Sequence, residues 1–223
     1  MTTGICPRKL QEAVTPYLTV PTFQQKWVEY QGTGSGYYYA LTYPSILSFY
    51  RDHGPLCCAL NLKVALVYSW NPTICKVKTR RFTAGRRQLA SLESCRKQLA
   101  GKSLLSVHTD AVIEAVWTPL KKVTSLKDSH SGVSVTKFLH FTFPHIFPMI
   151  DLDAMKKLGP SAVDQKPYTS FVSEWKNLYR DHQQCLDQIS TAVGMPVARV
   201  LDVMIFTPKK RKQEGAARGE THD

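Results

Sequence analysis

Several common targeting signals are missing from this chain of 223 residues. Its longest apolar run, around Val64–Tyr68, is far shorter than the roughly 20 residues of a membrane-spanning helix. The N-terminal residues lack the basic-then-apolar layout of a secretion signal. These absences favour an intracellular protein without a membrane partner, cytoplasmic or, in a eukaryotic host, nuclear.

Metal-ligand spacing is also lacking. The six cysteines contain no C-x-x-C pair, and the adjacent Cys57 and Cys58 do not have the spacing of a zinc site. We therefore predict free thiols in a reducing compartment, with no metal and no cofactor.

No segment alternates apolar and polar residues at period two, and no internal repeat is present. The apolar content of 43% is enough for a core. Together these features predict an all-α fold with one helical domain over residues 21–206. An irregular segment is expected over 1–20, and a disordered basic-polar tail over 207–223.

Apolar residues recurring every three or four positions, with proline and glycine at the ends, predict the helices. We expect them over 22–30, from Pro44 to Gly54, over 56–70, 84–100 and 108–118, from Gly132 to Phe143, from Asp151 to Gly159, over 167–193, and from Pro196 to 206. The helix over 56–70 is apolar nearly all round, which predicts that it is packed on several sides. The Gly32–Gly36 stretch lacks a following lysine, so a flexible turn is favoured over a phosphate-binding loop.

Positive charge is the most informative bulk property. The formal net charge is +12, and residues 76–102 hold nine lysines and arginines against one acid, Glu93. Clustered cations indicate a polyanionic partner, DNA more than RNA, with a solvated basic face as the alternative. The run at 208–212 resembles a nuclear localisation signal and is equally typical of a tail that holds nucleic acid. The cations predicted to contact nucleic acid are Arg80, Arg81, Arg86, Arg87, Lys209, Lys210, Arg211 and Lys212.

The stretch 131–153 combines chemically useful side chains on one compact unit. A turn at Gly132 is expected to lead into a short helix that carries Lys137 and His140. Pro144 must end that helix, and Asp151 stands where the next one begins, as a cap on unpaired amides.

Three stretches resemble small, mainly bacterial helical proteins: Tyr68–Ile74, Thr136–His140 with the prolines and aspartate that follow it, and Arg199–Asp202. More distantly, the central unit resembles the helix-hairpin-helix DNA glycosylases, the superfamily of 8-oxoguanine glycosylase and endonuclease III. That resemblance implies a phosphate-binding hairpin at Gly132–Ser134, a lysine nucleophile at Lys137 and an aspartate at Asp151. Ser134 stands where the glycosylases have the second glycine of the hairpin. One extra residue separates the hairpin from Lys137, so an alignment without a gap places Thr136, and not Lys137, at the position of the glycosylase lysine. The interval from Lys137 to Asp151 is also shorter than in the glycosylases.

These residue types fit base excision. A lysine amine of lowered pKa can attack the sugar C1′, and a carboxylate can stabilise the cation-like sugar once the base is flipped out. Each residue also has a structural alternative. Lys137 would be a solvated lysine in the first turn of its helix, and Asp151 would only cap the next helix. His140 would be a core histidine, with general acid–base catalysis as its functional alternative. The expected function is a DNA-binding protein that contacts phosphate, with glycosylase/lyase activity as a further expectation. A non-catalytic helical module that binds RNA or another protein is the alternative.

Overall fold

The computed structural model describes residues 4–53, 60–69, 89–124 and 131–206. Within these residues the chain forms eleven α-helices and no strand, so the prediction of a single all-α domain is confirmed. The first six helices are α1 (Pro7–Val14), α2 (Val20–Gln31), α3 (Gly34–Asp52), α4 (Leu60–Ser69), α6 (Leu89–Leu99) and α7 (Thr109–Thr124). The last five are α8 (Ser131–Thr142), α9 (Leu152–Leu158), α10 (Gln165–Asp181), α11 (Gln183–Val193) and α12 (Val197–Ile205).

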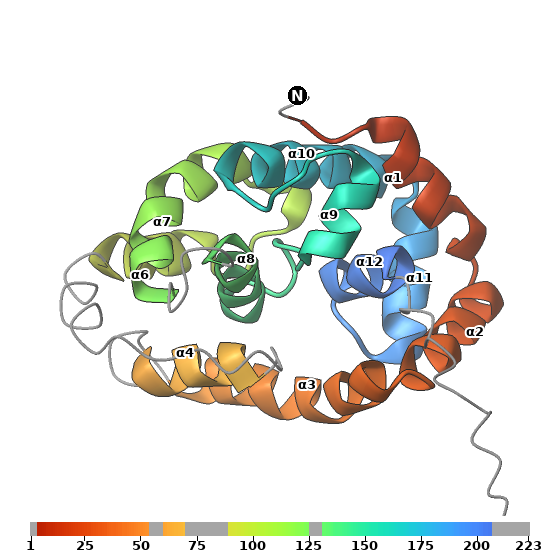
Figure 1. The fold of residues 1–223 in the computed structure, drawn as a ribbon, viewed down its shortest axis with the longest axis horizontal. Helices are drawn as coiled ribbons and strands as arrows, with labels where there is room; N and C mark the ends of the chain where they lie inside the picture. Colours follow the sequence, from red (N-terminus) through yellow and green to blue (C-terminus); the bar gives the residue numbers. More distant parts are fainter. Residues whose placement is uncertain (1–3, 54–59, 70–88, 125–130, 207–223) are drawn as a thin grey trace, which may run out of the picture.

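Helix α8 is the centre of the arrangement. Figure 1 shows it in the middle of the molecule, with α3 and α4 below it, α7 and α10 above it, and α12 beside it. It packs on α7, α4 and α3. Val135, Phe138 and Leu139 have no exposed surface. Burial on all sides explains why α8 has apolar residues around its whole circumference.

The N-terminal segment differs from the prediction. Residues 1–20 were expected to be irregular, but Pro7 begins helix α1, and the 3₁₀ turn Thr15–Tyr17 follows. Proline suits the first helical turn because that position has no intrahelical partner for an N–H group. Leu10 and Val14 are buried, and α1 packs against α12, α9 and α10.

Helix α3 begins ten residues earlier than predicted. The expected flexible turn at Gly32–Gly36 is instead a helix start, in which the Thr33 hydroxyl accepts a hydrogen bond from the Gly36 amide at 2.9 Å. Pro44 lies inside the helix, where a proline removes one hydrogen bond at a cost of about 3 kcal/mol. Burial of Tyr43 and Ile46 on either side of it offsets that cost.

The predictions for α4 and α7 were also wrong in part. Helix α4 is not enclosed on all sides, because Leu62 is 51% exposed. Helix α7 passes through Pro119 and continues to Thr124, beyond the predicted end at residue 118. Buried Val116, Trp117 and Leu120 hold the chain in place around the proline.

The long helix predicted over 167–193 is two helices. The chain leaves helical geometry at His182, where φ is −124° and ψ is 23°. The apolar stripe lapses there: Tyr179 is followed next by Leu186, so one turn lacks a core contact. Trp175, in the middle of the first part, is fully buried as the stripe predicts.

Candidate functional site

The connection from Phe143 to Ile150, between α8 and α9, is held in place by buried hydrogen bonds. The Thr136 hydroxyl lies 3.3 Å from the Ile150 carbonyl and accepts from the Ile150 amide at 3.5 Å. The Tyr168 hydroxyl donates to the Pro148 carbonyl at 2.8 Å. Backbone groups in a buried loop need such partners, and these bonds fix where Asp151 begins the next helix.

His140 belongs to the same set of contacts and lies wholly inside the protein. Its Nδ1 is 2.7 Å from the Phe147 carbonyl, and its Nε2 is 2.7 Å from the Tyr43 hydroxyl. A carbonyl only accepts, so Nδ1 carries the proton and Nε2 accepts from Tyr43. Burial is the main cause that lowers the pKa of His140 to about 3; the bond to Phe147 opposes this shift, and the charge of Arg199 adds to it. The geometry matches the core-histidine interpretation, with both ring nitrogens occupied.

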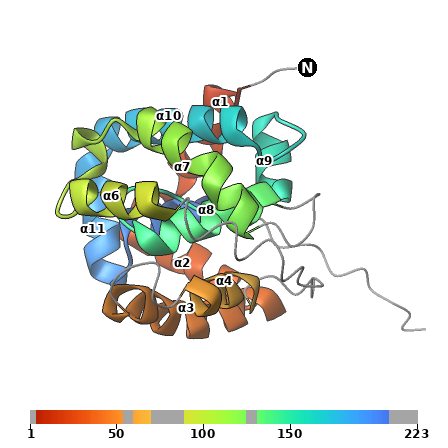
Figure 2. The same ribbon diagram turned by 90° about the vertical axis from the view of Figure 1, so that its left-hand side faces the viewer.

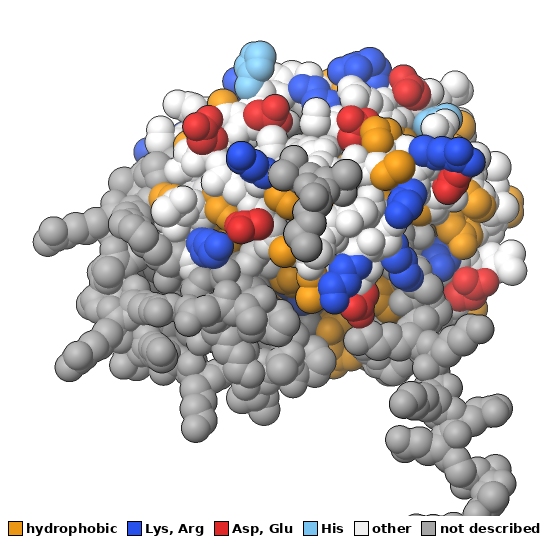
Figure 3. Space-filling view, turned by 45° about the horizontal axis from the view of Figure 1, so that its top comes forward, with side chains coloured by type: hydrophobic (Ala, Val, Ile, Leu, Met, Phe, Trp, Pro, Cys, Tyr) orange, Lys and Arg blue, Asp and Glu red, His pale blue; other side chains and the backbone are white. Residues whose placement is uncertain are grey.

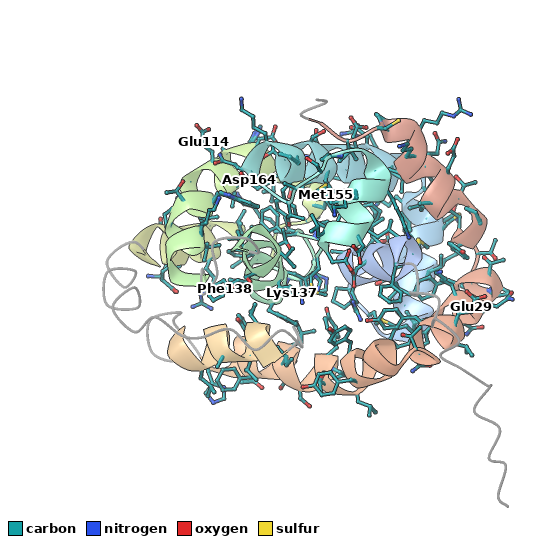
Figure 4. All side chains as sticks on the ribbon, in the orientation of Figure 1. Glu29, Glu114, Lys137, Phe138, Met155 and Asp164 are labelled. Carbon is teal, nitrogen blue, oxygen red and sulfur yellow. The ribbon has the colours of Figure 1, made fainter. Side chains whose placement is uncertain are left out.

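Lys137 lies one turn earlier on the same side of α8, toward α3. Figure 4 shows it on the side of α8 that faces α3, and its Nζ lies 5.9 Å from the centre of the Tyr39 ring. Burial lowers the pKa of Lys137 to about 8; the Asp151 carboxylate opposes this shift and the Arg199 guanidinium adds to it. The side chain keeps part of its solvent exposure. An amine with this pKa is about one-tenth neutral at pH 7.

Asp151 is the N-cap of α9, as the sequence indicates. Its Oδ1 accepts from the Ala154 amide at 2.7 Å, and its side chain is exposed. A capping carboxylate keeps its second oxygen for another partner. Asp151 is close enough to influence the charge on Lys137, but it does not contact His140 by any hydrogen bond that the described residues make.

A buried arginine stands beside this group. Arg199, on α12, is 1% exposed and lies between the rings of Tyr30 and Tyr43, 5.2 and 5.1 Å from their centres. It donates to the Tyr30 hydroxyl at 2.8 Å and forms an ion pair with Asp202. A guanidinium held between two aromatic faces is a favourable arrangement for a cation that has lost its water.

The structure has a helix where the sequence predicted a phosphate-binding hairpin at Gly132–Ser134. Gly132 and Ser134 lie in the buried first turn of α8 and do not form a turn ahead of it. A Cβ atom at Gly132 would lie 1.8 Å from the Val163 carbonyl oxygen. Glycine is needed at position 132 because another segment passes directly against it, which is a packing role. Phosphate binding by Gly132 and Ser134 stays a prediction, and the burial of both residues in a helix does not support it.

A groove of about 870 Å³ lies elsewhere, at the C-terminal end of α8. Its apolar lining includes Leu47, Leu99, Leu104, Phe141, Ile146 and Val197. Among the described residues, the cations that line it are Arg51, Lys63, Arg96, Lys97 and Lys102, and the carboxylate is Asp187. Neither this groove nor the smaller pocket between α7 and α10 is lined by Lys137, His140 or Asp151, so no pocket given by the described residues unites these three.

The remaining predicted contacts with nucleic acid, Arg80, Arg81, Arg86, Arg87 and Lys209–Lys212, lie outside the described residues. The described part of the chain holds 17 lysines and arginines against 13 acids, and the other residues hold 12 against 4. Two-thirds of the net charge therefore belongs to the residues outside it.

Sequence reasoning missed several residues of these sites. Arg51 and Lys63 are far in sequence from the basic stretch, and the ring partners Tyr30, Tyr39 and Tyr43 fit equally well on a core face. A single lysine within the apolar helix α4 was the available signal for Lys63, which is 1% exposed.

Within the described ranges, no three His, Cys, Asp or Glu side chains are grouped so that they could hold a metal ion. In the same ranges no single helix is long and apolar enough to cross a membrane; α11 and α12, which meet at a bend of 94°, pass that test only as a pair. Comparison with family models, curated proteins and solved structures finds no match to this chain.

Proposed function

We propose that the protein binds nucleic acid, DNA in the first place, through contacts with phosphate. One observation carries this proposal: the described end of the basic stretch 76–102 lies at the groove. Arg96, Lys97 and Lys102 belong to that stretch, and all three line the groove together with Arg51 from α3. Cations gathered around a concave surface attract a polyanion more strongly than the same charges spread over the molecule.

Charges elsewhere on the protein are mixed. On the face that Figure 3 shows, aspartate and glutamate side chains are scattered among the lysines and arginines. Some of the groove cations are also partly neutralised, since Arg51 pairs with Asp52 and Arg96 with Glu93. Lys97 and Lys102 are exposed and have no ion pair within the described residues. These two lysines are therefore the best candidates for direct phosphate contacts.

The test is a titration of labelled duplex DNA at several salt concentrations. Each neutralised phosphate contributes about 0.9 to the slope of log K against log salt. The double variant Lys97→Ala/Lys102→Ala should bind more weakly and lower the slope by up to about 1.8. Lys156→Ala/Lys157→Ala is the matched control, because it removes the same charge from exposed positions on α9, away from the groove.

Equal loss in both double variants would mean that net charge, and not this groove, determines binding. Absence of binding even at low salt would contradict the proposal and favour the alternative module with a protein partner. Both variants should keep the circular dichroism spectrum of the parent protein, because all four lysines are exposed.

A second candidate function, strand cleavage at abasic sites, has its own supporting observation. Burial gives the Lys137 amine a lowered pKa of about 8, as a Schiff-base lysine requires, and the Asp151 carboxylate is near enough to act on its charge. The neutral amine would add to the aldehyde C1′ of an abasic sugar, and loss of water would give the imine. Borohydride delivers a hydride to that imine and leaves a stable secondary amine between protein and DNA.

Trapping with abasic-site DNA and borohydride tests this activity directly. Lys137→Ala should abolish the covalent product, and Lys176→Ala should retain it, since Lys176 donates to the Val107 carbonyl, far from this site. Asp151→Asn should slow trapping and leave DNA binding unchanged. A product of equal yield from Lys137→Ala would assign the chemistry to another amine, and no product from the parent protein would remove the lyase from consideration.

A further inference from the structure

The groove has an interior that phosphate contacts alone leave unused. Its cations come from α3, α4, α6 and the turn after α6, whereas α8 and the connection after it supply Phe141, Phe143 and Ile146. Figure 2 shows α6 and α11 at the same edge of the molecule, with α3 below them. The volume of about 870 Å³ lies within the range of about 300–1,000 Å³ of cavities that accept small organic groups. The groove therefore has two parts: a row of cations that can bind phosphate, and aromatic and apolar walls that can contact a flat apolar group.

Duplex DNA can contact only one of these two parts, the row of cations. Its bases are paired and stacked, so it can present phosphates to the cations but no flat apolar group to the interior. Single-stranded nucleic acid presents both, because each unstacked base is followed by a phosphate. Aromatic residues within a positively charged groove are the usual combination in proteins that bind single strands.

The end of the groove formed by α10 and α11 is different in charge. Asp187 is the acid there, and one of its oxygens accepts from the Tyr179 hydroxyl at 2.8 Å. Burial and this carboxylate raise the pKa of Tyr179 to about 12, so the phenol stays protonated and continues to donate. The second oxygen of Asp187 can then accept from a ligand. A carboxylate repels phosphate and favours the exocyclic amino group of cytosine or adenine.

We infer that the groove binds an unstacked nucleobase of a single strand, with the flanking phosphates on Lys97 and Lys102 and the exocyclic amino group of the base at Asp187. This inference rests on the proposed nucleic-acid function and specifies its substrate. Cytosine and adenine, which carry an amino group at C4 and C6 respectively, should bind more tightly than thymine, which has a carbonyl at C4. One hydrogen bond to a charged acceptor corresponds to a preference of about 10-fold.

Binding of labelled oligo-dC, oligo-dA, oligo-dT and a duplex of the same length, at one salt concentration, tests the inference. We expect the two amino-bearing single strands to bind most tightly and the duplex to bind more weakly than dC. Asp187→Asn should reduce the dC-over-dT preference several-fold, since an amide can also donate to thymine. Asp181→Asn, which makes the same change of charge at an exposed position at the end of α10, should keep the preference. A single strand with 2-aminopurine at its centre should change its emission on binding to the parent protein, as the base leaves its stack.

The outcomes separate this inference from the proposed function. Equal binding of duplex and all single strands, lowered in each case by Lys97→Ala/Lys102→Ala, would retain phosphate binding and overturn base insertion. A single-strand preference that is the same for all bases and unaffected by Asp187→Asn would overturn the assignment of Asp187. No salt-dependent binding of any strand would overturn the proposed function itself.

Discussion

Acid should destabilise this protein through one side chain, His140. Burial without solvent contact holds its pKa at about 3 in the folded state, against about 6.5 in an unfolded chain. The unfolded chain therefore binds one more proton between these two values, so the free energy of unfolding falls as the pH is lowered through this window. The stability is fully present above pH 6.5 and is lost progressively below it. Each pH unit corresponds to about 1.36 kcal/mol, so the loss from pH 6.5 to pH 5 is about 2 kcal/mol.

Urea unfolding followed by tryptophan fluorescence at pH 7.5 and pH 5.0 measures this loss. His140→Gln keeps a side chain that can both donate and accept but cannot titrate, so the drop between the two pH values should shrink by about 2 kcal/mol. His182→Gln is a matched control, because His182 is only partly buried, at the break between α10 and α11. An equal drop in the parent protein and in His140→Gln would refute the reasoning, since it would show that His140 takes up its proton without unfolding.

Three further predictions concern packing and charge, each measured by chemical or thermal unfolding. Gly132→Ala should destabilise the fold or prevent it from forming, because a Cβ would collide with the Val163 carbonyl, whereas Gly101→Asn, at φ 73° in open space, should be tolerated. Trp175→Ala should cost about 3–5 kcal/mol, since the ring is fully buried; a cost below about 1 kcal/mol would contradict its place in the core. Asp202→Asn should cost about 3 kcal/mol by leaving the Arg199 charge inside without its carboxylate, and Arg199→Met/Asp202→Leu should cost less than the single change.

The spacing of apolar residues predicted most of the helices, and the errors in the predicted helix ends have identifiable causes. Prolines were expected to bound helices, and this held at Pro196, but Pro44 and Pro119 lie inside helices because buried neighbours offset the lost hydrogen bond. The break at His182 has no glycine or proline to mark it.

The candidate site was predictable in part. The Asp151 cap depends on neighbours in sequence and was anticipated. Contacts between distant segments, such as His140 with Tyr43, or the groove between α3, α6 and α11, depend on tertiary packing that no local pattern encodes. For the same reason the role of Gly132 was assigned to a turn, when its actual neighbour is Val163.

The contact between Tyr30 and Arg199 has a consequence for the synthesis of the protein. The two residues are 169 positions apart, so the ring of Tyr30 leaves the ribosome long before its partner exists. At about 5–20 residues per second, the delay is on the order of ten to thirty seconds. During that time α1 and α2 have no α12 to pack against, and their apolar faces stay open to other molecules. The nascent chain should therefore depend on chaperones early in translation, and the last helix should close the fold in a late step.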